Sequence, residues 1–136
     1  MPQARCNCGA ITVEAASAPK DPILCYCSNC QRSSAGLCSV NYIFQKPDVQ
    51  IHDPSGALRS YRDGDTRSGN VLTRQFCGVC GSPVSTLLSD DSPIIVIKAG
   101  LFDGPLPEPI DEVWTESKAA WMKIVKQERG ERAMLS

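Results

Sequence analysis

Cys25-Tyr26-Cys27-Ser28-Asn29-Cys30 places three thiols within six residues, and two further segments, Cys6-Asn7-Cys8 and Cys77-Gly78-Val79-Cys80, hold four more. Thiolates separated by one or two residues can converge on a single soft metal ion, and Zn²⁺ is typically bound by closely spaced cysteine pairs. The eighth cysteine, Cys38, stands alone among apolar residues, where we expect a small buried hydrophobe. The cysteine pattern therefore predicts metal sites that join distant parts of the chain.

Disulfide bonds are the main alternative use for these cysteines. Residues 1–5 lead directly into the first cluster, without the apolar segment of a signal peptide. A C-x-C disulfide would also be strained, because disulfide geometry requires a larger separation of the two residues. In a reducing compartment, clustered cysteines usually serve metal binding or catalysis. We therefore expect a cytoplasmic protein whose clustered cysteines bind zinc.

Length and charge limit the classes of partner. A chain of 136 residues fits one domain over residues 1–136, with a core of about 5–125. Its 14 basic and 15 acidic residues give a net charge of −1, and the scattered basic residues form no patch suited to nucleic acid. No apolar run approaches the ~20 residues of a membrane-spanning helix. We expect neither a nucleic acid nor a membrane as partner, and the oligomeric state stays open.

Frequent glycines and prolines divide the chain into short segments, which favours strands over long helices. Alternating or apolar patterns predict strands at residues 10–15, 37–44, 49–51, 57–61, 71–76, 84–88 and 94–97. Ser28 is a candidate cap for a short helical turn, and three prolines predict an extended surface segment at 102–109. Only Glu116–Glu128 has a helical composition, with a candidate buried stripe at Trp121, Ile124 and Val125. These patterns predict an all-β fold with short helical turns.

Seven clustered thiols divide naturally into four and three. A closed structural zinc site has four protein ligands, whereas a catalytic site has three and an open position. The first division pairs a compact cysteine triplet (Cys25, Cys27, Cys30) with a four-cysteine cluster (Cys6, Cys8, Cys77, Cys80). Cys-Gly pairs at 8–9 and 80–81 are consistent with two similar ligand loops that face each other. Spacing alone also allows one site made of Cys27, Cys30, Cys77 and Cys80, which leaves Cys6, Cys8 and Cys25 over.

Five segments occur together in a recognisable order. They are Cys6–Ile11, Cys25–Gly36, Arg74–Gly81, Ala99–Asp103 and Trp114–Trp121. In this order they resemble the glutathione-dependent formaldehyde-activating enzyme family, also called the centromere-protein-V-like family. The likeness covers about residues 5–125 and includes all seven of the family's cysteines. It implies a zinc-bound, all-β domain of the β-tent type, built from folded antiparallel sheets.

The resemblance also implies a function. It makes the four-cysteine cluster a structural zinc site and the triplet the ligand set of a catalytic zinc. The implied activity is that of a carbon–sulfur lyase, S-(hydroxymethyl)glutathione synthase, in which glutathione is the co-substrate and its thiol adds to formaldehyde. One residue departs from the pattern, because Tyr26 stands where the family commonly has histidine. That position lies between ligands, so the departure puts a substrate contact or proton route in doubt.

Three thiolates on Zn²⁺ give a formal charge near −1, which makes activation of an incoming thiol a better role than polarisation of a carbonyl. Arg32, Arg74 and Lys98 are candidate partners for the carboxylates of a tripeptide, while the single histidine, His52, is expected on the surface. Two other functions stay open for such a chain. One is a non-catalytic, zinc-stabilised module for protein interactions, and the other is a redox switch formed by the triplet.

Overall fold

The computed structural model describes residues 3–125 and contains two β-sheets. The small sheet has three antiparallel strands in the order β1 (Gln3–Arg5), β2 (Thr12–Ala15) and β5 (Val49–His52). The large sheet has seven strands in the order β10-β3-β4-β9-β8-β7-β6. Only β10 and β3 are parallel in it, and every other neighbouring pair is antiparallel. The predicted all-β fold of antiparallel sheets is therefore confirmed.

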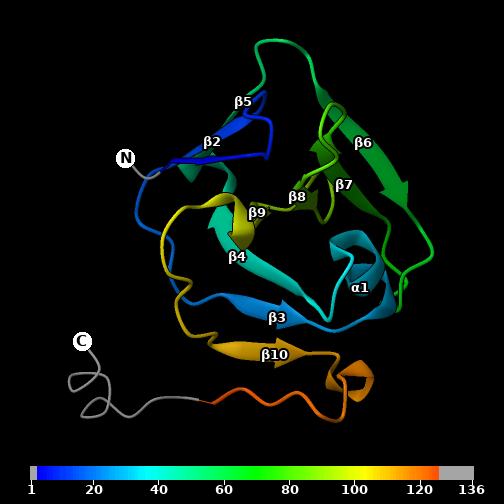
Figure 1. The fold of residues 1–136 in the computed structure, drawn as a ribbon. Helices are drawn as coiled ribbons and strands as arrows, with labels where there is room; N and C mark the ends of the chain where they lie inside the picture. The colour runs from blue at the N-terminus through cyan, green and yellow to red at the C-terminus, as the bar shows by residue number, and fades with distance from the viewer. Residues whose placement is uncertain (1–2, 126–136) are drawn as a thin grey trace, which may run out of the picture.

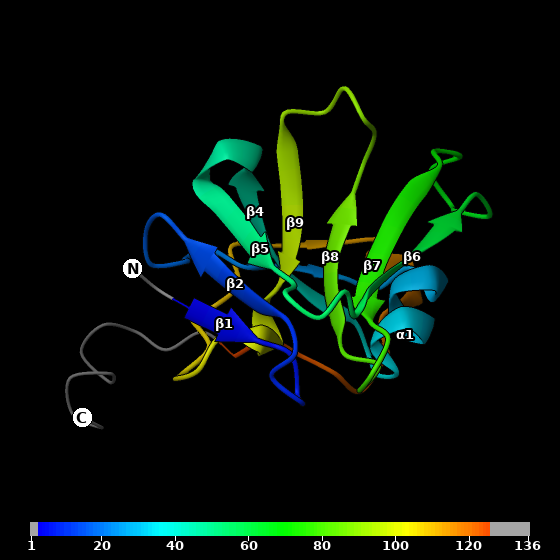
Figure 2. The same ribbon diagram turned by 90° about the horizontal axis from the view of Figure 1, so that it is seen from above.

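The large sheet curves around a short helix, α1 (Ser28–Ser34), as Figure 1 shows. Its strands are β3 (Ile23–Cys25), β4 (Ser39–Gln45), β6 (Leu58–Asp63), β7 (Leu72–Cys77), β8 (Pro83–Leu87), β9 (Ile94–Lys98) and β10 (Asp111–Val113). Strands β8 and β9 lie between the small sheet and α1 (Figures 1 and 2). One face of the large sheet therefore faces the small sheet, and the opposite face lies on the side of α1.

The main hydrophobic core fills the space between the two sheets. Successive side chains of a strand point to opposite faces, and in β9 Ile95 and Ile97 face this core while the intervening Val96 does not. Ile97 is fully buried, together with Ile11 and Val13 from the small-sheet side. The opposite face of β9 carries Val96 and Lys98 toward the side of the sheet on which α1 lies.

Each segment predicted as a strand contains one, and no boundary differs from its predicted position by more than two residues. Strands β1, β3 and β10 were not predicted, because three residues are too few to show a pattern of alternation. Ser28 begins α1 but does not cap it. The cap is Cys27, whose sulfur accepts a hydrogen bond from the Cys30 amide at 3.4 Å. The proline-rich residues 102–109 contain no strand or helix, apart from one bridge between Ala4 and Phe102.

The helix predicted at Glu116–Glu128 is absent from its described part, which ends at Val125. This part contains only the last two residues of a 3-10 turn, Thr115–Ser117. Trp121 is 75% exposed and Val125 is 84% exposed, so they form no buried stripe. A helix of this length is marginal in water unless an apolar face packs against something, which explains the error. Residues 126–128 lie outside the described residues.

Within residues 3–125, no helix combines the length and the apolar character that crossing a membrane requires.

Candidate metal centres and the adjoining cavity

The four-cysteine cluster joins two loops that are far apart in the sequence. Its sulfur atoms, from Cys6, Cys8, Cys77 and Cys80, all lie within 4.8 Å of one another. The Cys8 sulfur lies 3.7 Å from the Cys77 sulfur, although the two residues are 69 positions apart. All eight cysteines are free, so the chain contains no disulfide. The first predicted division of the thiols therefore corresponds to their positions.

The two loops of this cluster have similar turns. The Gly9 amide donates to the Cys6 carbonyl at 3.1 Å, and the Gly81 amide donates to the Cys77 carbonyl at 2.8 Å. Gly9 has a φ of +82° and Gly81 a φ of +79°, in the left-handed region that glycine adopts at little cost. The repeated Cys-Gly pair thus marks two turns that differ in length by one residue, each closed by a glycine with positive φ, and both present sulfur to a common centre.

Backbone amides are aimed at these sulfur atoms. The Ile11 amide donates to the Cys6 sulfur at 3.3 Å, and the amides of Val79 and Cys80 donate to the Cys77 sulfur at 3.4 and 3.5 Å. Hydrogen bonds to the charged form favour a thiolate. A set of four sulfur donors that receives amide hydrogen bonds fits Zn²⁺, which takes tetrahedral thiolate sites. The residues present therefore suit a structural zinc ion.

The triplet is buried between β3 and α1. Cys25 ends β3, Cys27 caps α1 and Cys30 lies in the first turn of the helix. Their sulfur atoms also lie within 4.8 Å of one another, and the Cys25 thiol donates to the Cys27 sulfur at 3.5 Å. A hydrogen bond from Cys25 lowers the pKa of Cys30 to about 5, and Ser39 contributes in the same direction. The triplet therefore holds a thiolate readily at neutral pH, as a metal site requires.

A cavity of about 240 Å³ adjoins the triplet. The triplet forms one wall, and the large sheet forms the floor with residues such as Ile43, Val96 and Lys98. Residues 66–68, in the loop between β6 and β7, and Trp114 line another part of it. The four-cysteine cluster has no residue in this cavity. The triplet is thus the cluster that a small molecule can approach through a cavity.

The sequence model of the glutathione-dependent formaldehyde-activating enzyme family matches residues 1–117. The chain belongs to this family. A crystal structure of a Rhodobacter sphaeroides protein has the same fold, with a TM-score of 0.59 and 18% sequence identity. The match covers 77% of this chain and 97% of that one. No curated protein matches the chain.

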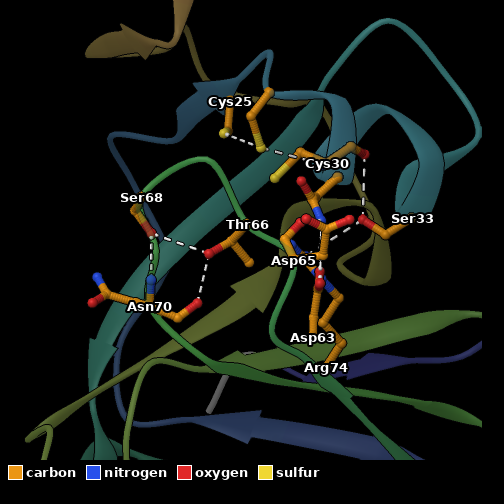
Figure 3. Close-up of polar contacts among 11 residues, drawn as sticks. Cys25, Cys30, Ser33, Asp63, Asp65, Thr66, Ser68, Asn70 and Arg74 are labelled. Carbon is orange, nitrogen blue, oxygen red and sulfur yellow. Dashed lines mark hydrogen bonds and ion pairs between the residues drawn. The ribbon is translucent and has the colours of Figure 1, made fainter.

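Within this family's fold, a buried ion pair links α1 to the sheet. The Arg74 Nε atom lies 2.7 Å from the Asp63 Oδ2 atom, and their side chains are 11% and 4% exposed. The Asn29 side chain of α1 donates to both Asp63 oxygens, at 3.1 and 3.0 Å. Burial acts to raise the pKa of Asp63, but the hydrogen bonds from Arg74 and Asn29 outweigh it and hold that pKa below its usual value. Figure 3 shows the pair on the Cys30 side of the triplet.

We expect Asp63→Asn to lower the free energy of unfolding by about 3–5 kcal/mol, because it leaves the buried Arg74 guanidinium without its counter-charge. The Asp63 carboxylate stabilises the folded state fully when the pH is above the ordinary aspartate pKa of about 3.9. This stabilisation is lost as the pH falls through the lower pKa that Asp63 has in the folded state. The loss should therefore be constant between pH 6 and 8, measured by urea denaturation of the metal-loaded protein. Glu116→Gln is the matched control, since its pair with Arg67 is largely exposed and should contribute less than about 1 kcal/mol. Equal losses in both variants would contradict the prediction.

Of the three basic residues predicted near a substrate, two line the cavity. Lys98 donates to the Asn41 side chain at 2.8 Å, and burial lowers its pKa while the charge of Cys30 opposes this. Arg74 also lines the cavity. Arg32 is exposed and is not part of it, and the predicted surface position of His52 is confirmed. Cys38 was expected to be a small buried hydrophobe, but it is only half-buried.

Tyr26 does not line this cavity, although it stands where the family commonly has histidine. Its fully buried side chain donates to a carboxylate oxygen of Glu112 at 2.5 Å, and Lys118 donates to the same oxygen at 2.7 Å. Burial and the bond to Glu112 raise the pKa of Tyr26, which keeps the phenol protonated at neutral pH. Tyr26 therefore ties the triplet loop to β10 rather than contacting the cavity.

Sequence reasoning missed the residues at the rim. Arg67 donates to Glu116 at 2.6 Å and to the Ser117 hydroxyl at 2.8 Å, and its guanidinium lies 5.3 Å from the centre of the Trp114 ring. These contacts join the loop between β6 and β7 to the segment that follows β10. The two segments are about 50 residues apart, and no motif in either indicates that they meet.

Proposed function

We propose that the chain is a zinc-dependent carbon–sulfur lyase resembling S-(hydroxymethyl)glutathione synthase. In this proposal, a single domain over residues 1–136, in the reducing cytoplasm, activates the thiol of glutathione for addition to formaldehyde or a related small electrophile. Family membership supports a function of the glutathione-dependent, formaldehyde-activating kind. The observation that carries the finer proposal is the buried triplet in the wall of a cavity.

The two clusters would have different roles. Cys6, Cys8, Cys77 and Cys80 offer a complete set of four ligands and would hold a structural zinc. Cys25, Cys27 and Cys30 offer three ligands and line the cavity, and they would hold a catalytic zinc, which with three protein ligands can still accept a substrate. When bound there, zinc would lower the pKa of a substrate thiol, as metals do for coordinated thiols.

The reaction itself is an addition across a double bond. The thiol sulfur forms a bond to the aldehyde carbon, the carbon–oxygen π bond breaks, and the thiol proton ends on the oxygen. Lys98 faces the cavity beside the triplet, so its ammonium group would offset the net negative charge of three thiolates and would attract a substrate carboxylate. The guanidinium of Arg74 is held by Asp63 and would mainly position α1.

The test counts metal ions and then measures turnover. Native mass spectrometry of the freshly prepared protein should give two zinc ions per chain. Exchange NMR with glutathione and formaldehyde should show faster formation of S-(hydroxymethyl)glutathione than in a sample without protein. Two zinc ions with no acceleration at millimolar glutathione would contradict the enzyme proposal and favour a non-catalytic zinc module. One zinc ion would contradict the assignment of a second metal to the triplet.

A further inference from the structure

Along β4 and β9, the floor of the cavity changes from polar to apolar with distance from Cys25, which is paired with Ser39 at the start of β4. Strand register places Lys98 of β9 opposite Asn41 of β4, and the next outward-facing pair is Val96 with Ile43. Ile94, two residues before Val96, also lines the cavity. In a strand, residues two apart share a face. The sheet therefore presents a polar end and an apolar end within one cavity.

The lining residues from β7 and β8 show the same change from polar to apolar. Thr86 is paired with both Val96 and Arg74, and the lining residues two positions away are Leu88, just after the end of β8, and Leu72, the first residue of β7. Two residues of strand span about 6.6 Å, which matches an extended chain of about five carbons. We call the apolar part of the floor the apolar shelf, made of Ile43, Leu72, Leu88, Ile94 and Val96.

Part of this apolar surface is open to solvent. Ile43 is 49% exposed and Trp114 is 38% exposed, although both belong to a cavity that also contains the triplet. Burying apolar surface on binding is favourable, by about 25 cal/mol for each Å² removed from water. Formaldehyde has no apolar group to cover these residues, and glutathione carries two carboxylates and an amine. Of the two substrates, only an electrophile larger than formaldehyde can therefore supply an apolar group that covers Ile43 and Trp114.

We infer that the electrophile for this chain is an unbranched aliphatic aldehyde of about five to seven carbons, whose chain lies on the apolar shelf. This inference rests on the proposed function, because it assigns the aldehyde of that same addition. Its carbonyl would lie near the triplet and Lys98, where the floor is polar, and the alkyl chain would extend toward Ile94 and Leu88. The bonds formed and broken are those of the addition to formaldehyde, so the product is the hemithioacetal of glutathione and the longer aldehyde.

The test compares formaldehyde, propanal, pentanal and hexanal with the zinc-loaded full-length protein and glutathione. Exchange NMR gives each rate, which is divided by the rate without protein to remove the intrinsic reactivity of the aldehyde. The acceleration should increase about two- to fourfold with each added methylene, as expected for burial of alkyl groups. Formaldehyde should therefore show the smallest acceleration in the series.

An independent measurement follows binding without reaction. Titration with 1-hexanol, which has the chain but no electrophilic carbon, should shift the backbone amide signals of Ile43, Leu88 and Val96. Ethanol at the same concentration should shift them much less. This readout depends on the apolar shelf and requires no turnover.

Ile43→Ala should reduce the ratio of kcat/KM for hexanal to that for formaldehyde by about fivefold, because it shortens the shelf. Ile43 is half-exposed, so its replacement leaves the core between the sheets intact. Ile110→Ala is the matched control, since Ile110 is 60% exposed and does not line the cavity. It should leave the ratio unchanged.

Acceleration of formaldehyde alone, with no shifts from 1-hexanol, would overturn the inference and leave the proposed function standing. Shifts from 1-hexanol without acceleration of any aldehyde would overturn the proposed addition reaction while supporting the shelf as a site for an apolar chain. A loss of the hexanal preference in Ile43→Ala but not in Ile110→Ala would support both.

Discussion

Cys77→Ser is expected to leave the chain unfolded at 25 °C and to remove one zinc ion. Cys77 ends β7, is fully buried and packs in the core between the two sheets. Its sulfur receives two amide hydrogen bonds from its own loop and lies 3.7 Å from the Cys8 sulfur. The substitution would therefore break a proposed metal site and place a hydroxyl in the core.

The expected effect is large compared with the stability of a domain. Structural zinc in finger peptides has an apparent binding free energy of about 10–16 kcal/mol, and an ordinary domain is stable by only about 5–15 kcal/mol. The cluster also closes a long loop, since Cys8 and Cys77 are 69 positions apart. Without the metal, the loop after β1 and the β7–β8 turn would keep the hydrogen bond from the Asn7 amide to the Ser82 hydroxyl but would lose the cross-link through their four sulfur atoms.

Zinc content and far-UV circular dichroism of the purified variant would measure this effect. Cys38→Ser is the matched control, because it makes the same change at a half-buried cysteine that belongs to neither cluster. The control should keep two zinc ions and a native spectrum. A folded Cys77→Ser protein with undiminished zinc content would show that this cluster does not hold the metal that stabilises the fold.

The cysteine clusters could be predicted from the sequence because each is local. Closely spaced thiols and the Cys-Gly pairs at 8–9 and 80–81 are visible in short stretches of residues, and both glycines adopt a positive φ. The division into four and three needed more than spacing. It follows from the position of the end of β7 beside the loop after β1, where the Cys8 and Cys77 sulfur atoms are 3.7 Å apart, and only the fold determines this position.

The cavity could not be predicted, because its parts are separate in the sequence. Its floor combines single residues from β4, β7, β8 and β9, and each looks like ordinary strand alternation. Tyr26 gave a misleading signal for a similar reason. Its place between two ligands pointed to the substrate, whereas strand β10 lies parallel to β3 and brings Glu112 to its hydroxyl.

A second large effect is expected from Cys25→Ser, this time on activity with the fold retained. Cys25, Cys27 and Cys30 lie within six residues, so a metal held by them closes only a short loop and contributes little to the folding of distant segments. Cys25 is the most suitable of the three to change, because Cys27 caps α1 and Cys30 lies within the helix. The variant should bind about one zinc fewer than the wild type and keep the native circular dichroism spectrum.

Its acceleration of hemithioacetal formation should fall at least about 100-fold, since an incomplete ligand set would no longer lower the pKa of the incoming thiol. Native mass spectrometry and exchange NMR on the same preparation would measure both quantities, with Cys38→Ser as the control that keeps both. A variant that has lost one zinc but accelerates the reaction as well as the wild type would place the chemistry away from the triplet. A variant that keeps both zinc ions and loses activity would instead show that Cys25 acts on the substrate without binding the metal. The contrast with Cys77→Ser then separates the two clusters, because Cys77→Ser removes the fold, whereas Cys25→Ser keeps the fold and removes one zinc ion and the reaction.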